Sequence, residues 1–155
     1  IHMRDATKDC MDILAQYAPL KGIMHCFSGS AETAKEAVKL GLMISFAGPL
    51  TFKNAKDAPE VCKYVPIDRL FVETDAPFLT PHPFRGKMNE PFYTHITFEK
   101  VCELKEIEPE VLIKQMAEFT GRKEKELFEA MERDNWMDPK DAKEFGLIDG
   151  ILERK

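Results

Sequence analysis

The chain has 155 residues, of which 44% are hydrophobic and 32% charged, and it carries a formal net charge of -5. This composition excludes a disordered chain. The apolar runs are too short to span a membrane. The length fits one ordinary domain. The negative charge argues against a generally basic nucleic-acid surface, although a local basic loop is compatible with it. The widely spaced cysteines, without a Cys-x-x-Cys pair or a secretory signal, indicate reduced thiols in a cytoplasmic protein.

The amino-terminal part alternates helices with short apolar strands. Apolar residues at helical spacing predict a helix over residues 7–17, and a strand follows over 21–25. Ser30 has the position of an N-cap and Gly41 that of a C-cap, so a second helix is expected between them. The apolar run 42–46 predicts the next strand.

The same alternation continues to residue 75. A helix is expected over 55–64 with Pro59 in its first turn, and a buried strand over 70–73. Helices alternating with apolar strands, at roughly 25 residues per unit, are typical of right-handed βαβ crossovers and a parallel sheet. The predicted fold class is therefore α/β, as a partial TIM-type (β/α) barrel followed by a mainly helical tail.

A long loop follows this strand. It is punctuated by Pro77, Pro81, Pro83, Gly86 and Pro91, and long loops after barrel strands commonly bind substrate. Arg85 and Lys87 lie in it. Their side chains suit phosphate oxygens, Arg85 as a planar fork and Lys87 as a point charge, but they could equally be solvated loop charges.

The rest of the chain has helical patterns over residues 92–104, 109–119, 123–132 and 140–145. Ile96, Val101 and Leu104 are the expected core face of the first of these helices. Asp138 is the expected N-cap of the last, with Pro139 in its first turn.

Three polar residues lie at strand ends: His2, His25 and Asp75. Because the carboxyl ends of parallel strands share one edge of a sheet, we expect the three side chains to converge. Two imidazoles and a carboxylate suit zinc, manganese or iron. Alternatively, each is an ordinary hydrogen-bonded residue at the end of a strand.

Four motifs, IHMRD (1–5), HCFSG (25–29), ETDAP (73–77) and RGKMNEP (85–91), together resemble the TatD family of metal-dependent deoxyribonucleases. The resemblance covers about residues 1–110. It implies a barrel of the metallo-dependent hydrolase kind, with a divalent two-metal site (Mg, Mn or Zn) that hydrolyses phosphodiester bonds in DNA or another phosphoester.

The resemblance also implies roles for single residues. His2, His25 and Asp75 match metal-ligand positions, and Asp75 would in addition orient the nucleophile as a catalytic residue. Arg85 and Asn89 match a loop near the site, where they are expected to bind substrate. The family's His-x-His motif and bridging glutamate would precede Ile1, so only part of the ligand set is expected here.

A second resemblance covers residues 111–155. The motifs EFTG (118–121), ERDNWM (132–137) and AKEFGLID (142–149) are similar to the carboxyl-terminal segment of the Clp protease proteolytic subunit. Asp134 matches its triad aspartate, but no matching nucleophile or histidine accompanies it, so this segment is expected to serve packing or association.

Two hypotheses therefore remain open. The first is a metal-dependent hydrolase that is incomplete in this chain and binds its divalent metal weakly. The second is a catalytically inactive chimeric or truncated α/β domain that forms a homo-oligomer to cover its open sheet edges.

Overall fold

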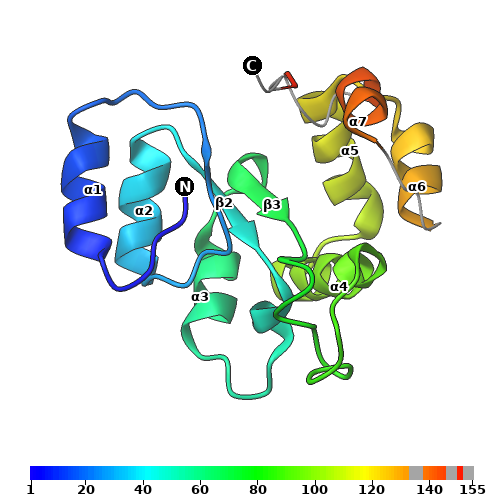
Figure 1. The fold of residues 1–155 in the computed structure, drawn as a ribbon, viewed down its shortest axis with the longest axis horizontal. Coiled ribbons are helices and arrows are strands. Elements are labelled where there is room, and N and C mark those ends of the chain that lie inside the picture. Colours follow the sequence, from blue (N-terminus) through cyan, green and yellow to red (C-terminus); the bar gives the residue numbers. More distant parts are fainter. Residues whose placement is uncertain (133–137, 146–149, 152–155) are drawn as a thin grey trace. The chain divides into compact units, whose positions relative to one another are not determined.

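The computed structural model describes residues 1–132, 138–145 and 150–151. The chain divides into two compact units, Ile1–Glu106 and Ile107–Lys155. Figure 1 shows the first as strands flanked by helices and the second as helices. No helix in the described ranges combines the length and the apolar character that crossing a membrane requires.

The first unit is built on a parallel sheet in the order β1-β2-β3. Its strands are β1 (Ile23–Met24), β2 (Met43–Phe46) and β3 (Leu70–Val72). Met24 pairs with Ile44, and Phe46 pairs with Val72. This order, sequential along the chain and parallel, is the one that the alternating pattern predicted.

The sheet buries its middle strand most completely. All four residues of β2 are buried, because β2 has a strand on each side and packs against α2. Leu70 is buried on β3, but Phe71 and Val72 are only half-buried. The prediction of a buried strand over 70–73 is therefore correct only in part, since β3 ends the described sheet.

Helices cover the strands of the first unit (Figure 1): α1 (Thr7–Ala15), α2 (Ala31–Lys39), α3 (Asp57–Tyr64) and α4 (Thr94–Lys105). Three 3₁₀ turns connect them: η1 (Gly48–Thr51), η2 (Ile67–Arg69) and η3 (Pro91–Tyr93). The predicted N-cap Ser30 is confirmed, whereas the C-cap of α2 is Leu40 and Gly41 follows it directly. Ser30 Oγ accepts a hydrogen bond from the N–H of Thr33 at 3.2 Å, and Gly41 has a left-handed φ of 96°.

The buried face of α4 differs from the predicted one. The buried residues are Thr97, Phe98, Val101 and Cys102. Ile96 and Leu104 are half-buried. The helix packs against α3 and η1, and its buried face includes Thr97, which hydrophobicity alone does not mark as core.

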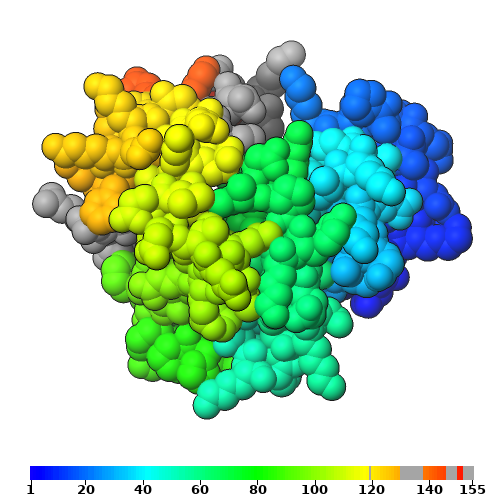
Figure 2. Space-filling model, turned by 180° about the vertical axis from the view of Figure 1, so that it is seen from behind, coloured from blue at the N-terminus to red at the C-terminus, as the bar shows by residue number. Residues whose placement is uncertain are grey.

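The second unit contains α5 (Pro109–Thr120), α6 (Glu124–Glu132) and α7 (Pro139–Phe145). Helices α5 and α6 contact each other, and their residues lie side by side in Figure 2, in yellow and orange. Gly121 ends α5 with a φ of 69°. Asp138 Oδ1 accepts hydrogen bonds from the N–H groups of Lys140 and Asp141, which confirms the predicted N-cap.

Part of the segment that resembles Clp protease cannot be compared with the structure. Asp134, most of the motif ERDNWM and the second half of the motif AKEFGLID lie outside the described residues.

Candidate metal centre

The two predicted histidine ligands lie next to each other. His2 and His25 form an isolated parallel β-bridge, in which the N–H of His25 donates to the carbonyl oxygen of Ile1 at 2.9 Å. Their imidazole centroids are 5.8 Å apart. Parallel pairing places both side chains at the carboxyl end of the sheet, as the strand-end positions predicted.

Asp75 reaches the same place from β3. Its Oδ1 lies 3.0 Å from Nε2 of His25, and the two side chains are 29% and 35% exposed. Asp75 has a φ of 58°, in the left-handed region. The structure therefore places both His2 and Asp75 beside His25, while the function of the three as metal ligands stays a prediction.

The candidate ligands chosen from the sequence left out Glu73, which the structure places in this cluster. Its Oε2 lies 2.5 Å from Nδ1 of His25, and its Oε1 accepts a hydrogen bond from the N–H of Cys26 at 2.5 Å. A signal for it was present in the sequence. Glu73 and Asp75 are two residues apart directly after a strand, the spacing at which both side chains can turn to the same side.

Hydrogen-bond accounting shows that the cluster suits a cation. A neutral imidazole carries one N–H, but His25 faces a carboxylate at each nitrogen. If Nδ1 donates to Glu73, the lone pair on Nε2 faces the oxygen of Asp75. Either a second proton on the ring or a cation between the two acceptors would satisfy that contact.

The spacing also fits a metal ion. Two ligand atoms that each lie about 2.1 Å from one ion are about 3 Å apart when the angle at the ion is near 90°, and Nε2 and Oδ1 are 3.0 Å apart. Within the described ranges, no group of three or more His, Cys, Asp and Glu side chains already has a metal-holding arrangement. The cluster therefore supplies a pair of ligand atoms at suitable spacing, with His2 alongside.

The thiol next to this cluster is protonated at neutral pH. Burial, followed by the negative charges of Asp75 and Glu73, raises the pKa of Cys26 to about 11. A protonated thiol is a poor metal ligand and a poor nucleophile. Cys26 therefore contributes its backbone N–H to the cluster and not a thiolate.

Asn89 has a structural position different from the substrate-binding one predicted for it. It is 3% exposed, and its Nδ2 donates to the carbonyl oxygens of Thr74 at 2.7 Å and Phe78 at 2.6 Å. Its Oδ1 accepts from the N–H of Glu90 at 3.0 Å. The amide is fully used within the loop that carries Asp75, so Asn89 holds that loop and presents no donor outward. Substrate contact by Asn89 stays an untested prediction.

Arg85 is exposed in the same loop. Its guanidinium carbon lies 4.3 Å from the ring centroid of Phe52, a cation–π contact. Within the described residues, no hydrogen bond, ion pair or ring contact joins Arg85 to His2, His25 or Asp75. Its place in the loop is compatible with substrate binding, and that function stays a prediction.

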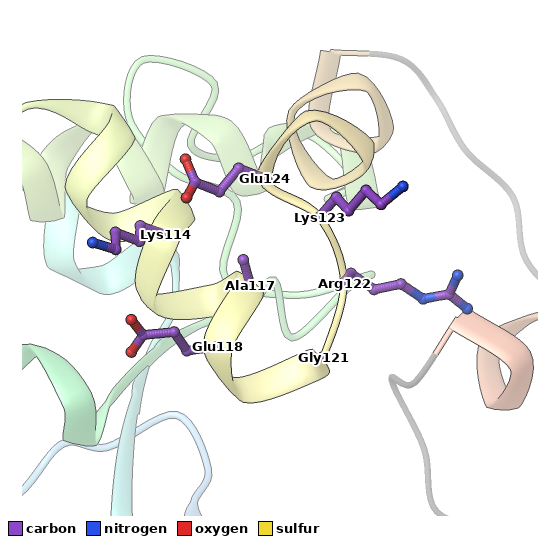
Figure 3. Close-up of a pocket in the computed structure, with 7 residues that line it drawn as sticks. All are labelled: Lys114, Ala117, Glu118, Gly121, Arg122, Lys123 and Glu124. Atoms are coloured by element: carbon purple, nitrogen blue, oxygen red, sulfur yellow. The ribbon is translucent and has the colours of Figure 1, made fainter.

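A hollow of about 500 Å³ lies in the second unit, between α5 and α6. Figure 3 shows its lining residues: Lys114, Ala117, Glu118, Gly121, Arg122, Lys123 and Glu124. Charges of both signs surround it. Arg122 is already engaged, since its Nε donates to the carbonyl oxygen of Phe145 at 2.7 Å. The hollow therefore offers no concentrated charge for a ligand of one sign.

Comparison with known proteins supports the motif resemblance. The model of the family described as TatD related DNase matches residues 1–123. A Bacillus subtilis protein named "Uncharacterized metal-dependent hydrolase YabD" is 52% identical over 130 residues, which cover 83% of this chain and 49% of that protein. The Escherichia coli K12 protein named "Uncharacterized metal-dependent hydrolase YcfH" is 42% identical over 114 residues, covering 72% of this chain and 43% of that protein.

Solved structures share the fold. The crystal structure of YJJV, a TatD homologue from Escherichia coli K12, matches with a TM-score of 0.71 and 29% identity, over 76% of this chain and 46% of that one. A TatD family hydrolase from Entamoeba histolytica matches in fold with a TM-score of 0.65, 22% identity and coverage of 76% and 47%. The chain thus spans about half the length of the relatives that it matches.

The match to the TatD related DNase family extends further along the chain than the motifs led us to expect. The family match continues to residue 123, so it includes the motif EFTG (118–121) that was compared with Clp protease. The comparisons give the Clp protease resemblance no support.

Proposed function

The chain belongs to the TatD related DNase family, and from this premise we propose that it carries part of a metal-dependent site for hydrolysing phosphodiester bonds in DNA. The observation that supports the proposal is the convergence of His25 and Asp75, with Nε2 and Oδ1 3.0 Å apart and His2 alongside. The relatives' names give the metal dependence but not the metal or the substrate.

We assign the residues as follows in this proposal. His2, His25 and Asp75 would hold a divalent ion, Mg²⁺, Mn²⁺ or Zn²⁺. Such an ion, when bound, polarises a phosphoryl oxygen and makes hydroxide available near neutral pH. The second oxygen of Asp75 accepts a hydrogen bond from the attacking water and orients it. Arg85 offers a planar pair of N–H donors to phosphate oxygens.

A second function is favoured by the geometry of the cluster. Among the described residues, no group of three or more His, Cys, Asp and Glu side chains already has a metal-holding arrangement, so the ligands that converge can be too few for turnover. In that case the chain is a scaffold that associates with further copies of itself.

A nuclease assay tests the first proposal. The full chain is incubated with single- and double-stranded DNA and Mg²⁺ or Mn²⁺, and compared with Asp75→Asn. We expect metal-dependent cleavage that falls by at least about 100-fold in the variant, because one ligand and the water-orienting oxygen are lost together.

The matched control for this assay is Asp68→Asn. It removes the same charge from a side chain that is 57% exposed in η2, and we expect its activity to equal that of the parent chain. Equal cleavage by Asp75→Asn, or no metal-dependent cleavage by the parent chain, contradicts the enzymatic proposal and leaves the scaffold.

A further inference from the structure

We propose that Glu73 is a positioning residue for the candidate metal centre. One of its carboxylate oxygens fixes the proton of His25 on Nδ1, and the other fixes the turn after His25. This inference rests on the proposed function, because the tautomer of His25 matters only if His25 binds a metal. The tautomer itself can be measured without metal.

Glu73 and the turn after His25 are both hydrogen-bonded to the same buried strand, β2. The N–H of Glu73 donates to the carbonyl oxygen of Phe46 at 2.9 Å, and the N–H of Phe27 donates to that of Ser45 at 2.9 Å. Phe46 and Ser45 are neighbours at the end of β2, whose residues are all buried. The strand β2 therefore sets the distance between Glu73 and the turn at His25.

The two carboxylate oxygens of Glu73 have different hydrogen-bond partners, and only one of these partners can change between donor and acceptor. Oε1 accepts from the backbone N–H of Cys26 at 2.5 Å, and a backbone N–H can only donate. Oε2 lies 2.5 Å from Nδ1 of His25, and an imidazole nitrogen can either donate or accept. The contact at Nδ1 is the shorter of the two that His25 makes with carboxylates, 2.5 Å against 3.0 Å at Nε2, so the geometry assigns the single proton of the neutral ring to Nδ1.

A proton on Nδ1 has a direct consequence for the other nitrogen. In the neutral ring, Nε2 then carries a lone pair, and this lone pair faces Asp75 Oδ1 at 3.0 Å. A histidine that binds a metal through one nitrogen commonly donates its other N–H to a carboxylate, which fixes the tautomer and the ring orientation. Glu73 therefore keeps Nε2 in the form that can bind a cation.

The substitution Glu73→Gln tests this logic because it preserves shape while changing one acceptor into a donor. The side-chain oxygen of Gln must face the N–H of Cys26, since that partner can only donate. The NH₂ group then faces Nδ1 of His25 and makes it an acceptor. We expect the tautomer to invert, with the proton on Nε2 donated to Asp75.

The measurement is long-range ¹H–¹⁵N NMR of the imidazoles in the metal-free full chain, at a pH where the rings are neutral. We expect the Nδ1–H form of His25 in the parent chain and the Nε2–H form in Glu73→Gln. Glu60→Gln is the matched control, because it removes the same charge from a side chain that is 70% exposed on α3, and it should leave the parent tautomer unchanged. Circular dichroism checks that the fold of each variant is preserved.

Calorimetric titration with Mn²⁺ or Zn²⁺ is the second measurement. Loss of a carboxylate that supports a ligand commonly weakens metal affinity about 10- to 100-fold, so we expect that loss in Glu73→Gln and none in Glu60→Gln. Should Glu73→Gln be misfolded, Glu73→Ala is measured in the same way and is expected to lose the preference for Nδ1–H.

The outcomes separate this proposal from the proposed function. Inversion of the tautomer supports the positioning by Glu73 even where the parent chain binds no metal, a result that counts against the proposed function alone. An Nε2–H tautomer in the parent chain, or an unchanged Nδ1–H tautomer in folded Glu73→Gln or folded Glu73→Ala, overturns the positioning proposal whatever the metal affinity.

Discussion

Asp75 has a left-handed backbone conformation that is costly for a residue other than glycine, so its loop must be held by other contacts. The N–H of Phe78 donates to the carbonyl oxygen of Asp75 at 2.9 Å, and the N–H of Asn89 to that of Pro77 at 3.0 Å. The side chain of Asn89 adds two hydrogen bonds, to Thr74 and Phe78. Asn89 thereby closes the loop around Asp75.

Asn89→Ala is expected to lower the free energy of unfolding by about 1–3 kcal/mol, because buried carbonyl oxygens lose their donor. Asn89→Asp should destabilise at least as much, since it replaces the NH₂ donor by an acceptor of the same shape. Chemical denaturation measures both. Asn54→Ala is the matched control at an exposed asparagine, and it should change stability by no more than about 0.5 kcal/mol. Equal effects at both positions would contradict the function given to Asn89.

These residues show what could be predicted from sequence. The strand-end positions predicted from sequence for His2, His25 and Asp75, combined with a parallel topology, were enough to predict that His2 and Asp75 lie beside His25. The contacts of Glu73 with His25 and of Asn89 with Thr74 join residues 48 and 15 positions apart. The hydrogen-bond partners of Glu73 and Asn89 depend on the strand register and on the path of the loop. The residue types alone do not predict either of these.

Among the elements, the connection after β2 depends on a glycine. A Cβ built on Gly48 in η1 would lie 1.8 Å from the carbonyl oxygen of Leu79. That oxygen belongs to the loop that follows Asp75 and is backbone, so it cannot move aside as a flexible side chain could. Gly48 therefore permits close packing between η1 and the loop.

Gly48→Ala is expected to destabilise the chain by about 1–3 kcal/mol, because the overpacked backbone must shift. The added methyl group displaces the loop that follows Asp75. We therefore expect Asp75 to shift and Mn²⁺ to bind more weakly in this variant. Gly22→Ala is the matched control, since its Cβ would meet only Leu42 Cδ2 at 3.4 Å. Thermal unfolding and calorimetric titration of the two variants give the comparison, and equal behaviour would contradict the packing argument.

The sequence predicted where the helices begin and end better than it predicted which face of a helix is buried. Ser30 and Asp138 cap the first turn of their own helices and Gly41 directly follows the end of α2, so these positions could be predicted from neighbours in sequence. The face of α4 was predicted less well, because it is set by packing against α3 and η1. Thr97 is buried there at 1% exposure, which a hydrophobic pattern does not indicate.

The two edges of the described sheet have different neighbours. Among the described residues, β3 pairs with one strand only, and it also contacts α4. At the opposite end, residues 1–2 extend the sheet beside β1, and Ile1 is 44% exposed. Within the described part of the chain, residues 1–2 pair with the chain at His25 on one side only, and a sheet edge of this kind can pair with another chain.

We propose that two copies of the chain associate through the end at Ile1, since using the same edge twice gives a closed, symmetric dimer. Light scattering after size exclusion should then give twice the monomer mass. Ile1→Lys should shift the mass toward the monomer, because an edge lysine opposes strand addition. Ile13→Lys is the matched control on α1, where the isoleucine is 56% exposed, and it should remain dimeric. A monomeric parent chain at every concentration measured would exclude this dimer. The scaffold function would then lose its support, and the nuclease assay would become the remaining test of what the chain does.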